Sequence, residues 1–239
     1  MRPHQEETEL VDLGAGSERK EVKVGIGMTP PPPIREEFVA LPRDYHDAFA
    51  WLYQDMPSLS HDIVKHRLPL NSGYSLVKQK LRRMKPRMLL KIKEEVKKQF
   101  DAGFLAVARY PEWVANIVPV PKKDGKVRMC VDYRDLNRAS PKDKFPVPHI
   151  NVHVDNTTNF ALFFFMDGFS GYNQIKMVPE DMEKTTFVTL WGTFCYKVMS
   201  FGLKNTGALF HDMMHREIEI YVDNMIAKFK TEEEYLVNL

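Results

Sequence analysis

Two aspartates, Asp167 and Asp223, each lie beside short apolar runs, and together they have the chemistry of a metal site. Asp167 directly follows the run Phe160–Met166, and Asp223 stands between two β-prone segments at 217–221 and 225–229. Carboxylates at two converging strand ends are what a two-metal phosphoryl-transfer site requires. The alternative is that Asp223 and Asn224 only form a tight hairpin turn, because both residue types tolerate a positive φ.

The elements that must position these carboxylates are helices and strands in irregular order. Apolar residues recur at helical spacing from Leu89 to Phe100, with Pro86 suited to a first turn and Gly103 to a helix end, so we expect a helix over 86–102. Strands are expected at 113–120, 127–133, 160–166, 185–189 and 193–198, and a short helix at 206–215. Since βα units do not alternate regularly, the sequence predicts an α+β fold.

Composition is that of a globular protein. Of 239 residues, 44% are hydrophobic and 28% charged, which favours a folded chain over a disordered one. Phe160–Met166 is too short for a membrane span, and the first residues lack the apolar core of a signal peptide, so we expect a cytoplasmic or nuclear protein without membrane contact. Cys130 and Cys195 lack nearby metal-ligand spacing and are expected to be buried, reduced thiols.

Positive charge is concentrated in residues 78–98. This segment holds ten Lys or Arg residues against Glu94 and Glu95, a net +8, so the rest of the chain sums to −6 against the total of +2. A block of this kind commonly follows a phosphate backbone. The other interpretation is a solvated helix face with some pairing between charges four residues apart.

Four segments in order resemble the reverse transcriptases of gypsy-type long-terminal-repeat retrotransposons, of the kind found in plant genomes. Val118–Asn137 resembles the fingers hairpin, Phe165–Ile175 the first catalytic strand, Phe201–Asn205 the second motif, and Tyr221–Asn224 the YxDD hairpin. The resemblance implies a right-hand polymerase fold with fingers and a partial palm, an antiparallel sheet with packed helices, and no thumb. Residues 1–40 are expected to be a disordered, acidic, proline-rich polyprotein linker, residues 41–85 an extension leading into the fingers, and residues 86–239 the fingers and incomplete palm.

The resemblance also implies roles for individual residues. Asp167 and Asp223, with Asn224 beside them, would be the catalytic positions, and the two aspartates would bind two Mg²⁺ ions. Template–primer RNA or DNA and deoxynucleoside triphosphates would be the partners. Bulk at Tyr172 would exclude a 2′-hydroxyl. The other nucleotide-binding positions would be Lys122, Lys123 and Arg128 at the triphosphate, and Phe201 and Gly202 in the nucleotide pocket.

For several of these residues, an ordinary structural role is the alternative to a functional one. Tyr172 could be an ordinary core aromatic, and the two lysines ordinary solvated charges at a hairpin tip. Asp132 and Arg134 indicate either an ion pair within the fingers or a contact with the template. His61 and His66 have no metal partners at useful spacing, so we expect both at the surface.

The chain departs from the family pattern in ways that concern activity. Asn224 stands where the family has a second aspartate, and Asn has little affinity for a hard cation. The spacing from Gly202 to Asp223 is 21 residues, which is about eight fewer than the resemblance implies, or about 12 Å of helix. Ser200 and Leu190 replace expected prolines, and the chain ends at Leu239. We therefore expect a catalytically impaired or inactive copy; the alternatives are a non-catalytic nucleic-acid-binding remnant and a decayed reading frame without function.

Overall fold

The structure is a computed structural model. It describes residues 8–12, 21–25, 36, 40, 50, 52–56, 58–122, 125–144, 151, 155, 157–158, 160, 162–167, 171–207, 209, 219–221 and 224–230. The chain divides into two compact units, residues 1–55 together with Leu239, and residues 56–238. No helix in the described part of the chain is long and apolar enough to cross a membrane.

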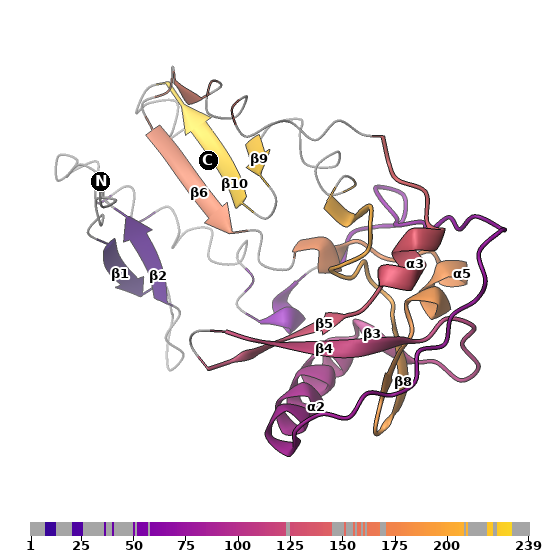
Figure 1. The fold of residues 1–239 in the computed structure, drawn as a ribbon. Helices are drawn as coiled ribbons and strands as arrows, with labels where there is room; N and C mark the ends of the chain where they lie inside the picture. The colour runs from indigo at the N-terminus through magenta and orange to yellow at the C-terminus, as the bar shows by residue number, and fades with distance from the viewer. Residues whose placement is uncertain are drawn as a thin grey trace. The chain divides into compact units, whose positions relative to one another are not determined.

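The second unit contains a five-stranded sheet and one long helix (Figure 1). The strand order is β3 (Leu105–Val107), β8 (Gly192–Tyr196), β7 (Phe187–Thr189), β4 (Ala115–Pro121) and β5 (Val127–Val131). All neighbours are antiparallel except β4 and β7. The expected antiparallel sheet is therefore interrupted by one parallel pair, because a long crossover separates these two strands in the sequence.

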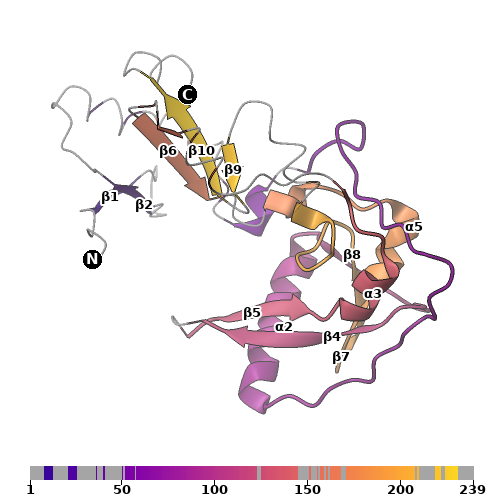
Figure 2. The same ribbon diagram turned by 45° about the horizontal axis from the view of Figure 1, so that its top comes forward.

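Helix α2 (Pro86–Asp101) contacts the two edge strands of this sheet, β3 and β5. Figure 2 shows the helix crossing β4 and β5. Pro86 occupies the first turn, and Gly103 follows the helix at φ +78°, as the sequence predicted. Ile92 and Val96 are the buried residues of its apolar face. They share the core with Leu105, Ile117 and Phe187, and the Phe187 ring lies 5.6 Å from that of Tyr196.

Strand β7 begins later than the predicted 185–189 segment. The hydroxyls of Thr185 and Thr186 donate to the carbonyls of Met182 and Glu183, at 2.7 and 2.6 Å. These local bonds hold Thr185 in the 3-10 helix η3 (Glu183–Thr185), which follows α5 (Pro179–Met182), so the extended chain starts only at Phe187.

A separate three-stranded antiparallel sheet has the order β6 (Leu162–Asp167), β10 (Asn224–Phe229) and β9 (Glu219–Tyr221). The predicted hairpin between 217 and 229 is confirmed, since β9 and β10 pair directly. Further short elements are α3 (Arg134–Ala139) and the 3-10 helices η1 (Tyr53–Asp55) and η2 (Gly171–Gln174). The mixture of sheets with few helices confirms the α+β class.

The first unit contains a paired hairpin of β1 (Thr8–Asp12) and β2 (Glu21–Gly25). These strands fall within the segment 1–40 that we expected to be a disordered linker, so the structure differs from that expectation at these residues. Alternation explains the difference: Val22 and Val24 are separated by Lys23, and such a period of two favours a strand. Most of the predicted helix at 206–215 lies outside the described residues.

Candidate active site

The β6–β10 pairing brings two of the predicted catalytic positions together. Asn224, the first residue of β10, is the register partner of Asp167, the last residue of β6. Asn224 also pairs with Tyr221 of β9, so the three strands meet at this end of the small sheet. Residues directly opposite in an antiparallel pair have Cα atoms about 4.5–5.5 Å apart. Asp223 precedes Asn224 in the sequence and lies outside the described residues.

Three of the predicted nucleotide-binding residues lie in a row. The Arg128 guanidinium is 5.9 Å from the centroid of the Phe201 ring, and that ring is 6.0 Å from the ring of Tyr172. Arg128 is exposed on β5, and Phe201 is also exposed, whereas Tyr172 is half-buried beside Ile175 and Met199. The row therefore presents a cation and an aromatic face to solvent, which suits a ligand with a phosphate and a flat or sugar-like part.

A side-chain clamp holds the turn that carries Phe201 and Gly202. Gly202 has φ +97°, a conformation that glycine adopts readily. Asn137 Nδ2 donates to the Gly202 carbonyl at 2.8 Å, and the Lys204 backbone N–H donates to Asn137 Oδ1 at 2.9 Å. Lys204 Nζ also donates to the carbonyls of Asn137 and Ser140, at 3.1 and 2.8 Å.

Sequence reasoning assigned no role to Asn137. Its place at the end of the fingers motif was a signal, but the partner lies 65 residues away, and no local pattern predicts such a contact. The clamp fixes the backbone under Phe201, so Asn137 belongs to the machinery of the candidate site.

The hairpin between β4 and β5 carries the remaining predicted phosphate contacts. Lys122 is exposed beyond the last paired residues, and its N–H donates to the Lys126 carbonyl at 2.9 Å. Gly125 closes the tip at φ +77°, and Lys91 Nζ of α2 donates to its carbonyl. Lys123 lies outside the described residues.

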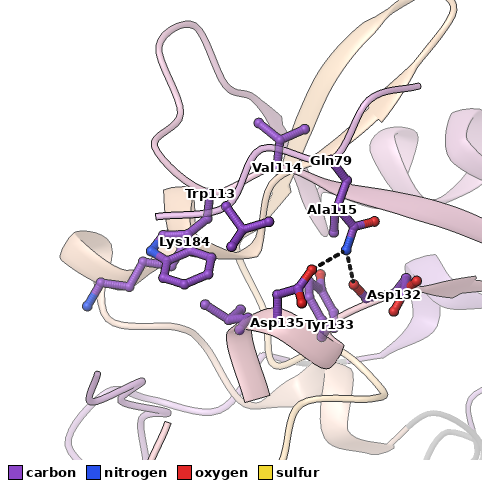
Figure 3. A pocket seen from close by; sticks show the side chains of 10 residues that line it. Gln79, Trp113, Val114, Ala115, Asp132, Tyr133, Asp135 and Lys184 are labelled. Atoms are coloured by element: carbon purple, nitrogen blue, oxygen red, sulfur yellow. Dashed lines mark hydrogen bonds between the residues drawn. The ribbon is translucent and has the colours of Figure 1, made fainter. Parts of the chain in front are cut away.

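Asp132 and Arg134 form the ion pair that was one of the two sequence interpretations. The Asp132 carboxylate accepts from Arg134 Nε at 2.7 Å and from Arg82 Nη2 at 3.1 Å. The hydrogen bond from Arg134 outweighs burial and lowers the pKa of Asp132 to about 2. Figure 3 shows the small pocket that Asp132 and Asp135 help to line, where Gln79 Nε2 donates to the Asp132 carbonyl at 3.3 Å and to Asp135 Oδ2 at 2.9 Å.

The expectation of a surface position is wrong for His66, although His61 is exposed. His66 is only 2% exposed, because its backbone bonds to Lys176 and Val178 and draws the side chain inward. Its Nε2 has no hydrogen-bond partner among the described residues. Burial lowers the pKa of His66 to about 4, against the opposing effect of Asp181.

We looked among the described residues for clusters of side chains that could hold a metal ion. Among them, no group of three or more His, Cys, Asp or Glu side chains is placed to hold an ion. The two cysteines are free thiols, Cys195 buried and Cys130 partly so.

Comparison with known proteins finds relatives of this chain among RNA-directed DNA polymerases. The family model described as reverse transcriptase (RNA-dependent DNA polymerase) matches residues 120–235. An RNA-directed DNA polymerase homolog of Oenothera berteroana is 36% identical over 103 residues, which cover 43% of this chain and 72% of the relative. The retrovirus-related Pol polyprotein from transposon gypsy of Drosophila melanogaster is 28% identical over 163 residues, or 61% of this chain and 15% of that polyprotein.

Solved structures share the fold at low sequence identity. The protease–reverse transcriptase of prototype foamy virus, in a mutant form, is 20% identical with a TM-score of 0.70, over 87% of this chain and 28% of that one. The foamy viral protease–reverse transcriptase in complex with an RNA/DNA hybrid is 19% identical with a TM-score of 0.65, over 86% of this chain and 28% of that one.

Proposed function

The chain belongs to the reverse transcriptase (RNA-directed DNA polymerase) family, and from this premise we propose a reverse-transcriptase-like domain with impaired catalysis. The family reaction would be RNA-directed DNA synthesis by two-metal nucleotidyl transfer. The observation that carries the proposal is the register of β6 and β10, which pairs Asp167 with Asn224. The same register supports both halves of the proposal, because it joins the two motif strands and makes an asparagine, not an aspartate, the register partner of Asp167.

The metal site would rest on Asp167 and Asp223. Carboxylate oxygens are the donors that a hard ion such as Mg²⁺ prefers, so these two residue types fit the ion. When bound, two such ions would neutralise the triphosphate and align the reacting oxygens. Asn224 would contribute an amide oxygen at most, and binding would be weaker than with a carboxylate there.

The nucleotide would bind along the row of Arg128, Phe201 and Tyr172. The exposed guanidinium suits a bidentate contact with phosphate, and Lys122 and Lys123 at the hairpin tip would add charge. Tyr172 would stand against the sugar and exclude a 2′-hydroxyl. The contacts of 5.9 and 6.0 Å within the row support a shared pocket, as does the clamp on Gly202.

Two features support impaired catalysis. The first is the missing carboxylate at Asn224, which lowers the negative charge available to hold cations. The second is the spacing of 21 residues between Gly202 and Asp223, about eight fewer than the family pattern implies and equal to about two turns of helix. A shorter connection would alter the floor of the nucleotide pocket, and small misplacements cost large factors in rate.

Template–primer and deoxynucleoside triphosphate binding tests the proposal. We expect a labelled RNA/DNA primer–template to bind, with further anisotropy change on adding nucleotide and Mn²⁺. Arg128→Ala should weaken the nucleotide response at least tenfold, since charge-assisted phosphate contacts are strong, while Arg67→Ala, at another exposed arginine, should not. Loss of the nucleotide response in both variants, or in neither, contradicts the assignment of Arg128.

A second candidate, nucleic-acid binding without catalysis, is favoured by the exposed basic residues of α2. Arg87, Lys93, Lys97 and Lys98 are exposed along this helix. Binding of this kind is driven by release of counterions, so its affinity should fall steeply with salt and be independent of metal. Replacing Lys85, Arg87 and Lys97 together by Gln should reduce the salt slope by about three. An unchanged slope argues against this candidate.

A further inference from the structure

We propose that Leu59 and Val64 are positioning residues that hold the Tyr172 ring, and that through this ring they set the preference for deoxyribonucleotides over ribonucleotides. Both lie in residues 59–68, here called the support segment, which is outside the four motifs that resemble reverse transcriptases. Neither residue would touch the nucleotide. Because both would act on the proposed nucleotide pocket, their role rests on the proposed function.

Two buried side chains connect the support segment to the Tyr172 ring. Ile175 and Met199 are both fully buried, and Leu59, Val64 and Tyr172 all pack against them. The Met199 N–H donates to the Ile175 carbonyl at 2.7 Å, and the Ile175 N–H donates to the Tyr172 carbonyl at 3.1 Å. The two residues of the support segment and the ring therefore belong to one apolar cluster.

The support segment is fixed near both of its ends by backbone hydrogen bonds to η2 and the residues after it. The Leu59 N–H donates at 2.9 Å to the carbonyl of Gln174, the last residue of η2. Further along, the His66 N–H donates to the Lys176 carbonyl at 2.9 Å, and the Val178 N–H donates to the His66 carbonyl at 3.0 Å. The support segment is thus held against the same stretch of chain that carries the ring.

Local structure decides which side chains of the support segment face the cluster. The Ser60 carbonyl accepts from the N–H groups of Ile63 and Val64, at 3.1 and 3.3 Å, and this closes a turn. After the turn, exposure alternates as in an extended chain: Val64 is half-buried, Lys65 is exposed and His66 is buried. Ile63, in contrast, is 71% exposed. The adjacent residues Ile63 and Val64 therefore have opposite surroundings.

Support of the ring matters because a pocket rejects a 2′-hydroxyl by its shape. Rejection of an added hydroxyl by shape is worth about 100-fold, and it requires a wall that does not yield. Truncating Leu59 or Val64 would leave a void beside Ile175 and Met199. Since protein interiors are close-packed, the other side chains of the cluster would respond to that void. The Tyr172 ring would then retreat and make room for the hydroxyl.

Nucleotide affinity for two different sugars tests this role in the full chain. Anisotropy of a labelled RNA/DNA primer–template, titrated with dATP or ATP in the presence of Mn²⁺, gives a Kd for each nucleotide. The readout is the Kd for ATP divided by the Kd for dATP, with uracil as the next template base. Leu59→Ala and Val64→Ala should each lower this ratio about tenfold, and Leu59→Met, which keeps the volume, should preserve it.

Two control variants separate positioning from general packing. Ile63→Ala trims an exposed side chain next to Val64. Val96→Ala removes the same methyl groups as Val64→Ala, but from the buried face of α2. Both controls should leave the ratio unchanged, although Val96→Ala lowers the free energy of unfolding. A ratio that falls equally in Val96→Ala would show that it only follows stability, which overturns the proposal.

A double variant tests whether Leu59 acts through Tyr172. Tyr172→Ala should bring the ratio close to one, because the ring that rejects the hydroxyl is gone. Leu59→Ala should then have no further effect, since residues that act through one shared group are not additive. An equal fall of the ratio in the Tyr172→Ala background would show another route and would contradict positioning through this ring.

The outcomes keep this role apart from the proposed function. If the unaltered protein prefers dATP and neither Leu59→Ala nor Val64→Ala changes the ratio, the support segment only packs, and the proposed function stands. If it binds both nucleotides equally, Tyr172 excludes nothing and the support role is wrong, while nucleotide binding stands. If it binds neither nucleotide, the proposed pocket fails and the support role with it. Should both alanine variants fail to fold, Leu59→Val replaces them, and an unchanged ratio in that variant overturns the proposal.

Discussion

Asn224 and Asp167 are direct partners in the antiparallel pairing of β10 with β6. Two carboxylates opposite one another in such a ladder repel when no cation lies between them. In the proposed site an amide at 224 would avoid that repulsion, so we expect the small sheet to need no metal for its stability. Asn224 would then weaken the proposed chemistry and at the same time favour the metal-free fold.

Asn224→Asp should make the stability of the protein depend on metal. Without cation the variant should lose about 0.5 kcal/mol, the usual size of an unfavourable cross-strand pair. Added Mg²⁺ or Mn²⁺ should restore the loss by binding the folded state. Thermal unfolding with and without chelator measures this, and Asn71→Asp, at an exposed turn, is the control. Equal responses of the two variants to metal would contradict the proposed site.

The buried His66 should make the fold sensitive to mild acid. Its pKa is about 4 in the folded protein, below the usual 6.5, so the unfolded chain binds the proton more readily. Stability is therefore full above pH 6.5 and falls as the pH drops toward 4, by up to about 2 kcal/mol at pH 5. In urea unfolding, His66→Gln should flatten this dependence, whereas His61→Gln should not. A slope that persists in His66→Gln would assign it to other groups.

Asp132 should contribute stability with a pH dependence of the same sign as that of His66, in a more acidic range. Its pKa is depressed to about 2, so its contribution is present above about pH 4 and is lost as the pH falls through 2. Because Arg82 and Arg134 are themselves exposed, solvent screens the pair, and we expect Asp132→Asn to cost about 1–2 kcal/mol at pH 7. The cost should be smaller at pH 3. Asp62→Asn, at an exposed carboxylate, should cost less than about 0.5 kcal/mol throughout.

Gly202→Ala should strain the turn that carries Phe201. An added Cβ would lie 3.7 Å from the nearest atoms of Tyr133 and Val131, so space is adequate, and the cost of about 1 kcal/mol would come from φ +97° alone. Gly73→Ala has no such conformation and is the matched control. If nucleotide binds at this turn, Gly202→Ala should also weaken it in a calorimetric titration. Equal unfolding free energies for the two variants would show that the turn relaxes.

Local periodicity predicted much of the fold. Pro86 and Gly103 bracketed α2 correctly, and the β4–β5 and β9–β10 hairpins followed from alternation around turn residues. The parallel contact of β4 with β7 was missed, since it joins segments about 70 residues apart and depends on how the intervening chain returns. His66 was misplaced for the same reason: its burial comes from backbone bonds to residues 176 and 178.

In the candidate site, too, local motifs could be predicted from the sequence and long-range contacts could not. Motif order alone indicated Asp167, Asn224, Arg128 and Phe201, and the structure adds their neighbours. Asn137 and Arg82 act through contacts 65 and 50 residues away, and no residue pattern near them signals these partners.

Primer extension on a primed RNA template, with Mg²⁺ and then Mn²⁺, tests the central claim most directly. We expect the protein to bind the primer–template without extending it, and we expect Asn224→Asp alone not to restore extension. Clear extension by the unaltered protein that disappears in Asp167→Ala would contradict impaired catalysis. Extension by Asn224→Asp would show that the short Gly202–Asp223 connection is tolerated and that the missing carboxylate alone limits the reaction.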